Sequence, residues 1–149
     1  MDFPTRVKLA IYEHFAATGA RPEAAEIARS LGESGESIDG IREAYRELAG
    51  KRVLVLEEDG ESIRMAPPWS GIPTQHRVLS GGVSHYANCA WDALGIPAAL
   101  HAPATVDSRC EQSLEPLRIE VTPVGPVPVP CIVHFAVPAA RWWENIVDT

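Results

Sequence analysis

The chain has 149 residues, of which 46% are hydrophobic and 22% are charged, and its formal net charge is −7. This length suits one domain or two small ones, and the hydrophobic fraction is ordinary for a chain that buries a core. The acidic balance argues against a general nucleic-acid binder, which usually carries a basic patch.

The start of the chain and its cysteines indicate the compartment. The opening Met1-Asp2-Phe3-Pro4 is acidic and lacks the apolar region of a signal peptide. No apolar stretch approaches the length of a membrane span. The three cysteines are an odd number, and we expect a cytoplasmic protein with reduced thiols. This matters for function, because only free thiolates bind metal.

Residues 1–66 are predicted to form a winged-helix-like domain. Apolar spacing and caps predict helices at 4–17, 22–31 and from Ser37 to about Ala49, a turn over 32–35, and a hairpin of strands at 53–56 and 63–65 around Asp59-Gly60. Three helices followed by a hairpin are the plan of a winged helix, whose third helix reads DNA in DNA-binding members.

The charges of this domain do not favour DNA binding. Residues 1–66 hold nine Lys or Arg against thirteen Asp or Glu, a net charge of −4. Phosphate binding needs positive charge. The predicted recognition helix carries Arg42 and Arg46, but also Asp39, Glu43 and Glu47. We therefore expect a structural domain that packs on the rest of the chain.

Residues 67–83 are predicted to be a Pro- and Gly-rich arm, with a short extended stretch at 77–79. Trp69 in this arm either covers an apolar pocket or anchors the arm to the core. We favour the anchor, because a large aromatic residue is usually well buried.

Residues 84–149 are predicted to form a second, α+β domain. A core helix over 84–94 ends at Gly95-Ile96-Pro97; strands follow at 104–108, 117–121 and 131–137, with a loop or edge at 123–130 and a last helix at 138–146. The predicted fold class is α+β, with a helical front domain followed by one helix on a small, mostly antiparallel sheet.

Cys89 and Asp92 lie three residues apart in an otherwise apolar stretch. On a helix, residues three apart share one face. Burial raises the pKa of a carboxyl and keeps it able to donate a proton. A thiolate beside such a carboxyl is a plausible pair for binding a soft metal and moving a proton. The alternative is that Cys89 is a small buried hydrophobe and Asp92 a surface residue or a cap.

The stretch around these two residues resembles the signature of the organomercurial (alkylmercury) lyase family. The family pattern Tyr-Ala-x-Cys-Ala-x-Asp-x-Leu-x-x-Pro is matched by Tyr86, Ala87, Cys89, Ala90, Asp92, Leu94 and Pro97. A second match is Cys131-Ile132-Val133-His134-Phe135, which resembles the family's Cys-x-Val-His-Phe strand. Cys110 falls where the family often has a further cysteine. The resemblance covers about residues 60–143.

The resemblance implies cleavage of a carbon–mercury bond by protonation of the carbon. By position, Cys89 is the thiol that captures the organomercurial and Asp92 carries the proton. A second cysteine, Cys131, completes the binding of the released Hg(II), which then passes to small thiols or to a mercuric reductase. The resemblance implies no organic cofactor.

Cys131 departs from the family pattern. Members commonly read Phe-Cys-Cys-x-Val-His-Phe, and the alignment places Pro130 at the catalytic cysteine and Cys131 one residue later. One residue of offset on a strand points a side chain to the opposite face. Cys131 therefore faces Cys89 only if the Pro-rich loop shifts the register or a bulge intervenes. Cys110 is the other candidate, or else a structural buried thiol.

Two further expectations follow from the same comparison. His134 alternates with Val133 and Phe135 and is expected to be held by hydrogen bonds, without a role as a metal ligand. Family members continue beyond the position where this chain stops, so the resemblance implies a more open site or one completed by a partner subunit.

Three hypotheses are left open by the sequence. The first is a carbon–mercury lyase. The second is a non-catalytic thiol-based protein of the same fold that binds or senses metal. The third is a winged-helix regulator with a lyase-like effector domain. The position of Cys131 relative to Cys89 separates the first two, and a basic face on residues 38–52 would favour the third.

Overall fold

Local sequence signals determine where the first and third helices begin and end. The computed structural model describes residues 1–32 and 37–147, and its three front helices are α1 (Phe3–Thr18), α2 (Ala24–Ser30) and α3 (Ile38–Gly50). The Asp2 carboxylate accepts a hydrogen bond from the Thr5 amide (2.9 Å), and the Ser37 hydroxyl accepts one from the Gly40 amide (3.0 Å). Both are N-cap interactions, and the one at Ser37 was predicted. The predicted turn over 32–35 lies largely outside the described residues.

Two glutamates determine where α2 begins, and one glycine determines where α1 ends. Helix α2 begins two residues later than predicted because Glu23 and Glu26 form a capping box around its first turn. Gly19 ends α1 with a φ of +72°, a left-handed conformation that favours glycine. A Cβ on Gly19 would also collide with the backbone carbonyl of Ser84. Gly19 therefore allows α1 to pack closely against the strand that contains Ser84.

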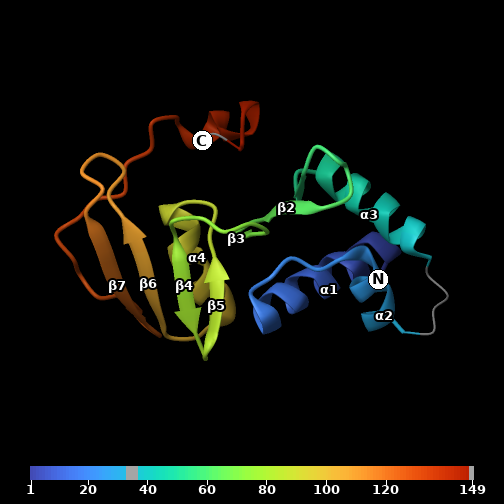
Figure 1. Cartoon of the computed structure of the whole chain (residues 1–149), viewed down its shortest axis with the longest axis horizontal. Coiled ribbons are helices and arrows are strands. Elements are labelled where there is room, and N and C mark those ends of the chain that lie inside the picture. Colours follow the sequence, from blue (N-terminus) through green and yellow to red (C-terminus); the bar gives the residue numbers. More distant parts are fainter. Residues whose placement is uncertain (33–36, 148–149) are drawn as a thin grey trace.

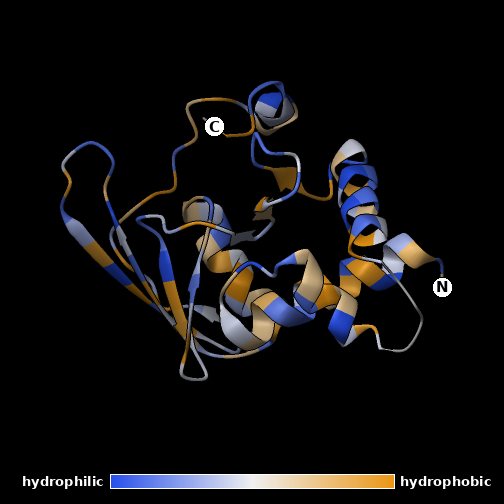
Figure 2. Ribbon diagram, turned by 45° about the vertical axis from the view of Figure 1, so that its right-hand side comes forward, coloured by the Kyte–Doolittle hydropathy of each residue, from blue (hydrophilic) through white to orange (hydrophobic). Residues whose placement is uncertain are grey.

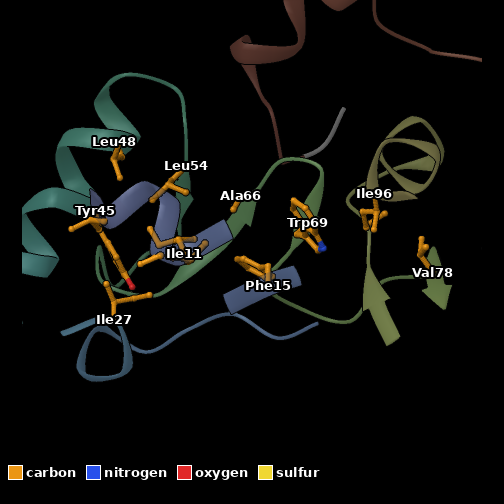
Figure 3. Packing of buried hydrophobic residues seen from close by; sticks show 14 of the residues in the cluster. Ile11, Phe15, Ile27, Tyr45, Leu48, Leu54, Ala66, Trp69, Val78 and Ile96 are labelled. Carbon is orange, nitrogen blue, oxygen red and sulfur yellow. The ribbon is translucent and has the colours of Figure 1, made fainter. Parts of the chain in front are cut away.

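The buried faces of these helices form the front part of the core, as the apolar spacing predicts. On α1 and α3, the residues with this spacing are buried (Val7, Ala10, Ile11, Phe15, Ile41, Tyr45, Leu48). Figure 3 shows several of them converging with Ile27 of α2 and with Leu54, which precedes the first strand. The cluster continues through Trp69 to Val78 and Ile96, so one core joins the helices to the second sheet.

A small antiparallel sheet follows the helices. Its strands, in the order β1-β2-β3, are β1 (Val55–Leu56), β2 (Ile63–Ala66) and β3 (Trp69–Ser70). The β1–β2 hairpin was predicted, and its turn is held by the Asp59 carboxylate, which accepts hydrogen bonds from the amides of Glu61 and Ser62. The order of three helices and a hairpin agrees with the predicted order of elements. The assignment to a winged helix stays a prediction.

A larger antiparallel sheet forms the other end of the molecule (Figure 1). Its strands, in the order β5-β4-β6-β7-β8, are β4 (Arg77–Ser80), β5 (Val83–Tyr86), β6 (Ala104–Arg109), β7 (Pro116–Thr122) and β8 (Gly125–Pro126). Buried Val78 on β4 pairs with His85 on one side and with Val106 on the other. Helices and antiparallel sheets together confirm the mixed α/β character of the predicted α+β fold. None of the helices in the described ranges is both long and apolar enough to span a bilayer.

The segment 67–83 was predicted as an arm but contains β3 and β4, with β4 inside the larger sheet. Its prolines and glycines occupy the connections, so they did not prevent strands between them. The anchoring role of Trp69 is confirmed: its side chain is buried and stacks on Phe15, with ring centroids 6.2 Å apart.

The core helix begins later than predicted. Helix α4 covers Ala90–Leu100, whereas residues 84–86 of the predicted helix pair with β4 as part of β5. The helix also continues through Pro97, which was expected to end it. Ile96 and Pro97 are buried, and we attribute the continuation to this burial, which offsets the hydrogen bond that proline cannot donate. The Cys89–Asp92 pair therefore lies at the beginning of the helix and not in its middle.

The predicted strand at 131–137 is wrong. These residues have no regular secondary structure, and all except Val137 are exposed. The last ladder contact is the Val127 amide donating to the Glu120 carbonyl (2.8 Å); Pro128 and Pro130 then lack amide protons, so the ladder cannot continue. We call residues 127–147 the C-terminal arm. Figures 1 and 2 show it leaving the sheet and running, with several hydrophobic stretches, to the short 3₁₀ helix η1 (Ala139–Glu144), which replaces the predicted last helix.

Candidate functional site

Cys89 lies at the residue that precedes the first turn of α4. Its backbone is extended (φ −148°, ψ 178°), and its carbonyl accepts the first helical hydrogen bond, from the Ala93 amide (3.0 Å). The thiol is partly buried and sits beside amide groups that have no partner within the helix. A helix N-terminus favours negative charge, which is one of the effects that act on the ionisation of this thiol.

Opposing effects act on the ionisation of this thiol. Burial raises the pKa of Cys89, and the negative charge of Asp92 acts in the same direction. The backbone N–H groups of Asp92 and Trp91 act against both, although neither meets the geometry of a capping hydrogen bond. The net direction is upward, so the pKa of the Cys89 thiol lies above its ordinary value.

Asp92 lies in the first turn of α4, on the same side as the thiol. Burial raises the pKa of its carboxyl, and a hydrogen bond from Asn88 partly offsets this effect. The Asn88 amide nitrogen donates to Asp92 Oδ2 at 2.9 Å. A raised pKa favours the protonated form of this carboxyl more than exposure to water would.

Asn88 connects this pair to the smaller sheet. Its amide nitrogen also donates to the backbone carbonyls of Trp69 (3.2 Å) and Pro68 (3.5 Å). Its Oδ1 atom is buried without a hydrogen-bond partner among the described residues. The amide nitrogen is thus held between two backbone carbonyls and the carboxylate.

Cys89, Asp92 and Asn88 are the polar part of the lining of a cavity of about 170 Å³. The rest of its lining is apolar or aromatic and comes from the smaller sheet and the C-terminal arm: Met65, Pro67, Phe135, Trp142, Trp143, Ile146 and Val147. A larger groove, of about 410 Å³, lies between α4 and the β7–β8 turn, but its lining contains no Cys, Asp or Glu. The smaller cavity is therefore the better candidate for a reactive site.

The aromatic wall of the small cavity is held by a few specific contacts. The rings of Phe135 and Trp142 lie 5.0 Å apart at 51°, and Trp91 meets Phe135 edge-on at 6.4 Å. The Trp142 indole donates a hydrogen bond to the Val137 carbonyl (2.8 Å). The guanidinium of Arg52 lies over the Trp143 ring, 5.7 Å from its centroid.

The structure does not place the other two cysteines in the cavity lining. Cys131 is exposed on the C-terminal arm, four residues before Phe135, and Cys110 is exposed in the turn between β6 and β7. The expectation of a structural buried thiol at Cys110 is therefore wrong; the Ser113 amide donates to its sulfur (3.4 Å), and such hydrogen bonds lower its pKa. Within the described residues, no three His, Cys, Asp or Glu side chains converge on one point.

Two of the histidines, His85 and His76, are buried beside a polar neighbour, whereas His134 is exposed. His134 is exposed, and the strand alternation assumed for it does not exist. Fully buried His85 receives a hydrogen bond at Nδ1 from the Trp69 indole (3.2 Å), and burial lowers its pKa. His76 is buried with Nδ1 2.8 Å from the Ser108 hydroxyl.

Sequence reasoning missed the partners of Asp92. Asn88 occupies a variable position of the family pattern, and only its place beside Cys89 could have drawn attention to it. Tyr12 is far away in sequence, yet its hydroxyl donates to the Pro67 carbonyl (3.2 Å). Burial raises the pKa of Tyr12, and the charge of Asp92 adds to that increase, which places the two groups in one electrostatic environment.

Comparisons with known proteins identify similar chains. The family model described as alkylmercury lyase matches residues 69–149. Alkylmercury lyases of Bacillus cereus and Clostridium butyricum are each 26% identical over 108 residues, which is 70% of this chain and 47% of theirs. The chain thus spans about half the length of these relatives.

A solved structure described as the mercury-bound form of MerB2 shares the fold. It is 22% identical, with a TM-score of 0.56, and the match covers 83% of this chain and 66% of that one. The family model alone covers more than half of the chain and contains both Cys89 and Asp92. The resemblance seen in the sequence is confirmed, and the chain belongs to the alkylmercury lyase family.

Proposed function

We propose that this protein cleaves the carbon–mercury bond of small organomercurials and binds the released Hg(II). The observation that carries the proposal is the lining of the cavity, where the Cys89 thiol and the Asp92 carboxyl share one space with apolar and aromatic side chains. A soft thiolate suits the mercury, and an apolar wall suits the organic group.

The proposed reaction has two steps without a change of oxidation state. First, the Cys89 sulfur bonds to mercury and loses its proton as the organomercurial gives up its other ligand. Asp92 then transfers its proton to the carbon, the electron pair of the carbon–mercury bond forms the new carbon–hydrogen bond, and Asp92 is left as a carboxylate. Hg(II) stays on the sulfur, and no organic cofactor is needed.

Cys131 is proposed as the second thiol for the released Hg(II). It lies on the same arm as Phe135, which lines the cavity, and its exposure leaves it free to meet an outside ligand. Small thiols or a mercuric reductase would then accept the metal from this exposed position, as the family resemblance implies. This part of the proposal rests on the position of Cys131 along the arm, since its sulfur does not line the cavity.

The test separates capture from cleavage. Wild-type, Asp92→Asn and Asp92→Ala proteins are incubated with phenylmercury, and released benzene and bound mercury are measured together. We expect normal mercury capture in both variants, with benzene release slower by about 10²- to 10⁴-fold, the usual effect of removing a positioned acid. Asp39→Asn changes a carboxyl that is exposed on α3 and serves as the matched control.

Equal benzene release from wild type and the Asp92 variants would refute the role of Asp92. Mercury capture without benzene from the wild type would favour the second hypothesis, a thiol-based metal-binding or sensing protein of the same fold. A winged-helix regulator is less well supported, because Arg42 and Arg46 on α3 both lie near the Glu61 carboxylate, at 3.1 and 4.0 Å. Phosphate binding would have to compete with these contacts.

A further inference from the structure

Asn88 has a hydrogen-bonding arrangement that fixes the orientation of its amide. An Asn side chain presents two N–H donors on one atom and a carbonyl acceptor on the other, and neighbouring groups decide which atom lies where. Here the carbonyl oxygens of Trp69 and Pro68 lie 3.2 and 3.5 Å from one terminal atom of the side chain. Backbone carbonyls only accept hydrogen bonds, so this atom must be the nitrogen.

The fixed Asn88 amide in turn determines which oxygen of Asp92 accepts a hydrogen bond. The same nitrogen lies 2.9 Å from Asp92 Oδ2, so this oxygen must accept a hydrogen bond. A protonated carboxyl has one oxygen that carries the proton and one that accepts. With Oδ2 engaged as the acceptor, the proton of the acid form belongs on Oδ1.

We propose that Asn88 is a positioning residue that holds the Asp92 carboxyl with its transferable proton on Oδ1, ready for delivery to the carbon bound to mercury at Cys89. The last clause rests on the proposed function; the hydrogen-bond arrangement does not. Asn88 acts through Asp92, and its anchors are main-chain carbonyls of the smaller sheet. The Asp92 carboxyl is thereby connected to the segment around Pro68 and Trp69, which the strands β4 and β5 separate from it along the chain.

The expected effect of removing Asn88 follows from the loss of orientation. Without the amide, Asp92 can rotate and place its proton on either oxygen. A misplacement of about 1 Å in a reacting group costs about 10²-fold in rate. We expect Asn88→Ala to slow benzene release from phenylmercury by about 10- to 100-fold, with mercury capture by Cys89 unchanged.

A double-mutant cycle separates positioning from general structural damage. In an Asp92→Ala background, Asn88→Ala should change the remaining cleavage by no more than about twofold, because the residue it orients is gone. A structural defect would instead slow both backgrounds equally. Asn88→Asp keeps the shape but replaces the donor with an acceptor, and it should behave like Asn88→Ala. Equal slowing in both backgrounds, or full activity in Asn88→Ala, would overturn the proposal.

A second measurement does not depend on turnover. The side-chain amide of Asn88 gives its own ¹H–¹⁵N signals in nuclear magnetic resonance, and these should shift on Asp92→Ala but not on the control Asp39→Asn. Unchanged Asn88 signals in Asp92→Ala would overturn the positioning role even if the protein cleaves phenylmercury. Shifted signals in a protein that releases no benzene would support the hydrogen bond while the lyase proposal fails.

Discussion

The two walls of the cavity are held by different means. The reactive wall lies at the start of α4, a helix whose Ala93 and Ile96 are fully buried, and hydrogen bonds tie it to the smaller sheet. The opposite wall belongs to the C-terminal arm, where Phe135 is 41% and Trp143 37% exposed. Groups that need fixed geometry thus lie on a packed element, whereas those that shape the cavity lie on an irregular segment.

The largest expected effect concerns the reactive wall. Cys89→Ser should abolish benzene release, and when the exposed thiols Cys110 and Cys131 are also replaced by serine it should abolish phenylmercury capture as well, because a hydroxyl is a hard, weak ligand at neutral pH. Mercury bound per protein is measured after removal of the free reagent. Cys110→Ser is the matched control, since it changes an exposed thiol outside the cavity. Stoichiometric mercury retention on the variant with all three cysteines replaced, or unchanged benzene release from Cys89→Ser, would refute the role of Cys89 in the reactive wall.

The second prediction compares the stability of the two walls. Ile96→Ala removes a fully buried side chain behind α4 and should lower the free energy of unfolding by about 2–5 kcal/mol. Ile132→Ala makes the same change on the C-terminal arm, where the side chain is 89% exposed, and should alter it by less than about 0.5 kcal/mol. Urea unfolding followed by circular dichroism measures both. Similar losses would mean that the arm is as tightly packed as the helix.

The smallest expected effect concerns selectivity between substrates. An apolar cavity of about 150 Å³ accommodates benzene, so this cavity is large enough for a phenyl group. Trp142→Ala removes one ring of the wall and should lower kcat/KM for phenylmercury relative to methylmercury by about 10-fold, since a methyl group makes few contacts there. Ile132→Ala, on the same arm but outside the cavity, is the control. An unchanged ratio in Trp142→Ala would exclude the arm from substrate selection.

The elements that could be predicted are those whose signals are local. The capping residue Ser37 and the apolar spacing of α1 and α3 depend on neighbours within a few residues, and the structure agrees with them. The strand at 131–137 failed because alternating apolar residues indicate a strand only where a partner strand can pair with it. The prolines of the arm removed the amide groups that such pairing needs.

The candidate site was predictable in part for the same reason. The spacing of three residues brings Cys89 and Asp92 to the same side of α4, whether the helix starts before Cys89 or after it. Asn88 could not be predicted, because its role depends on two carbonyls of the segment that contains Trp69, which the fold brings alongside. Pro97 misled the prediction of the helix end, since the burial of its side chain cannot be read from local sequence.

The glycine at the end of α1 has a consequence for how this sequence can change over time. Any side chain at Gly19 would push against the Ser84 carbonyl, and Ser84 belongs to β5, the strand that leads directly into Asn88 and Cys89. A substitution there would therefore shift the reactive thiol from a distance. Selection for catalytic activity alone would therefore preserve Gly19. Substitutions of Gly19 would be found among inactive variants although this residue does not line the cavity.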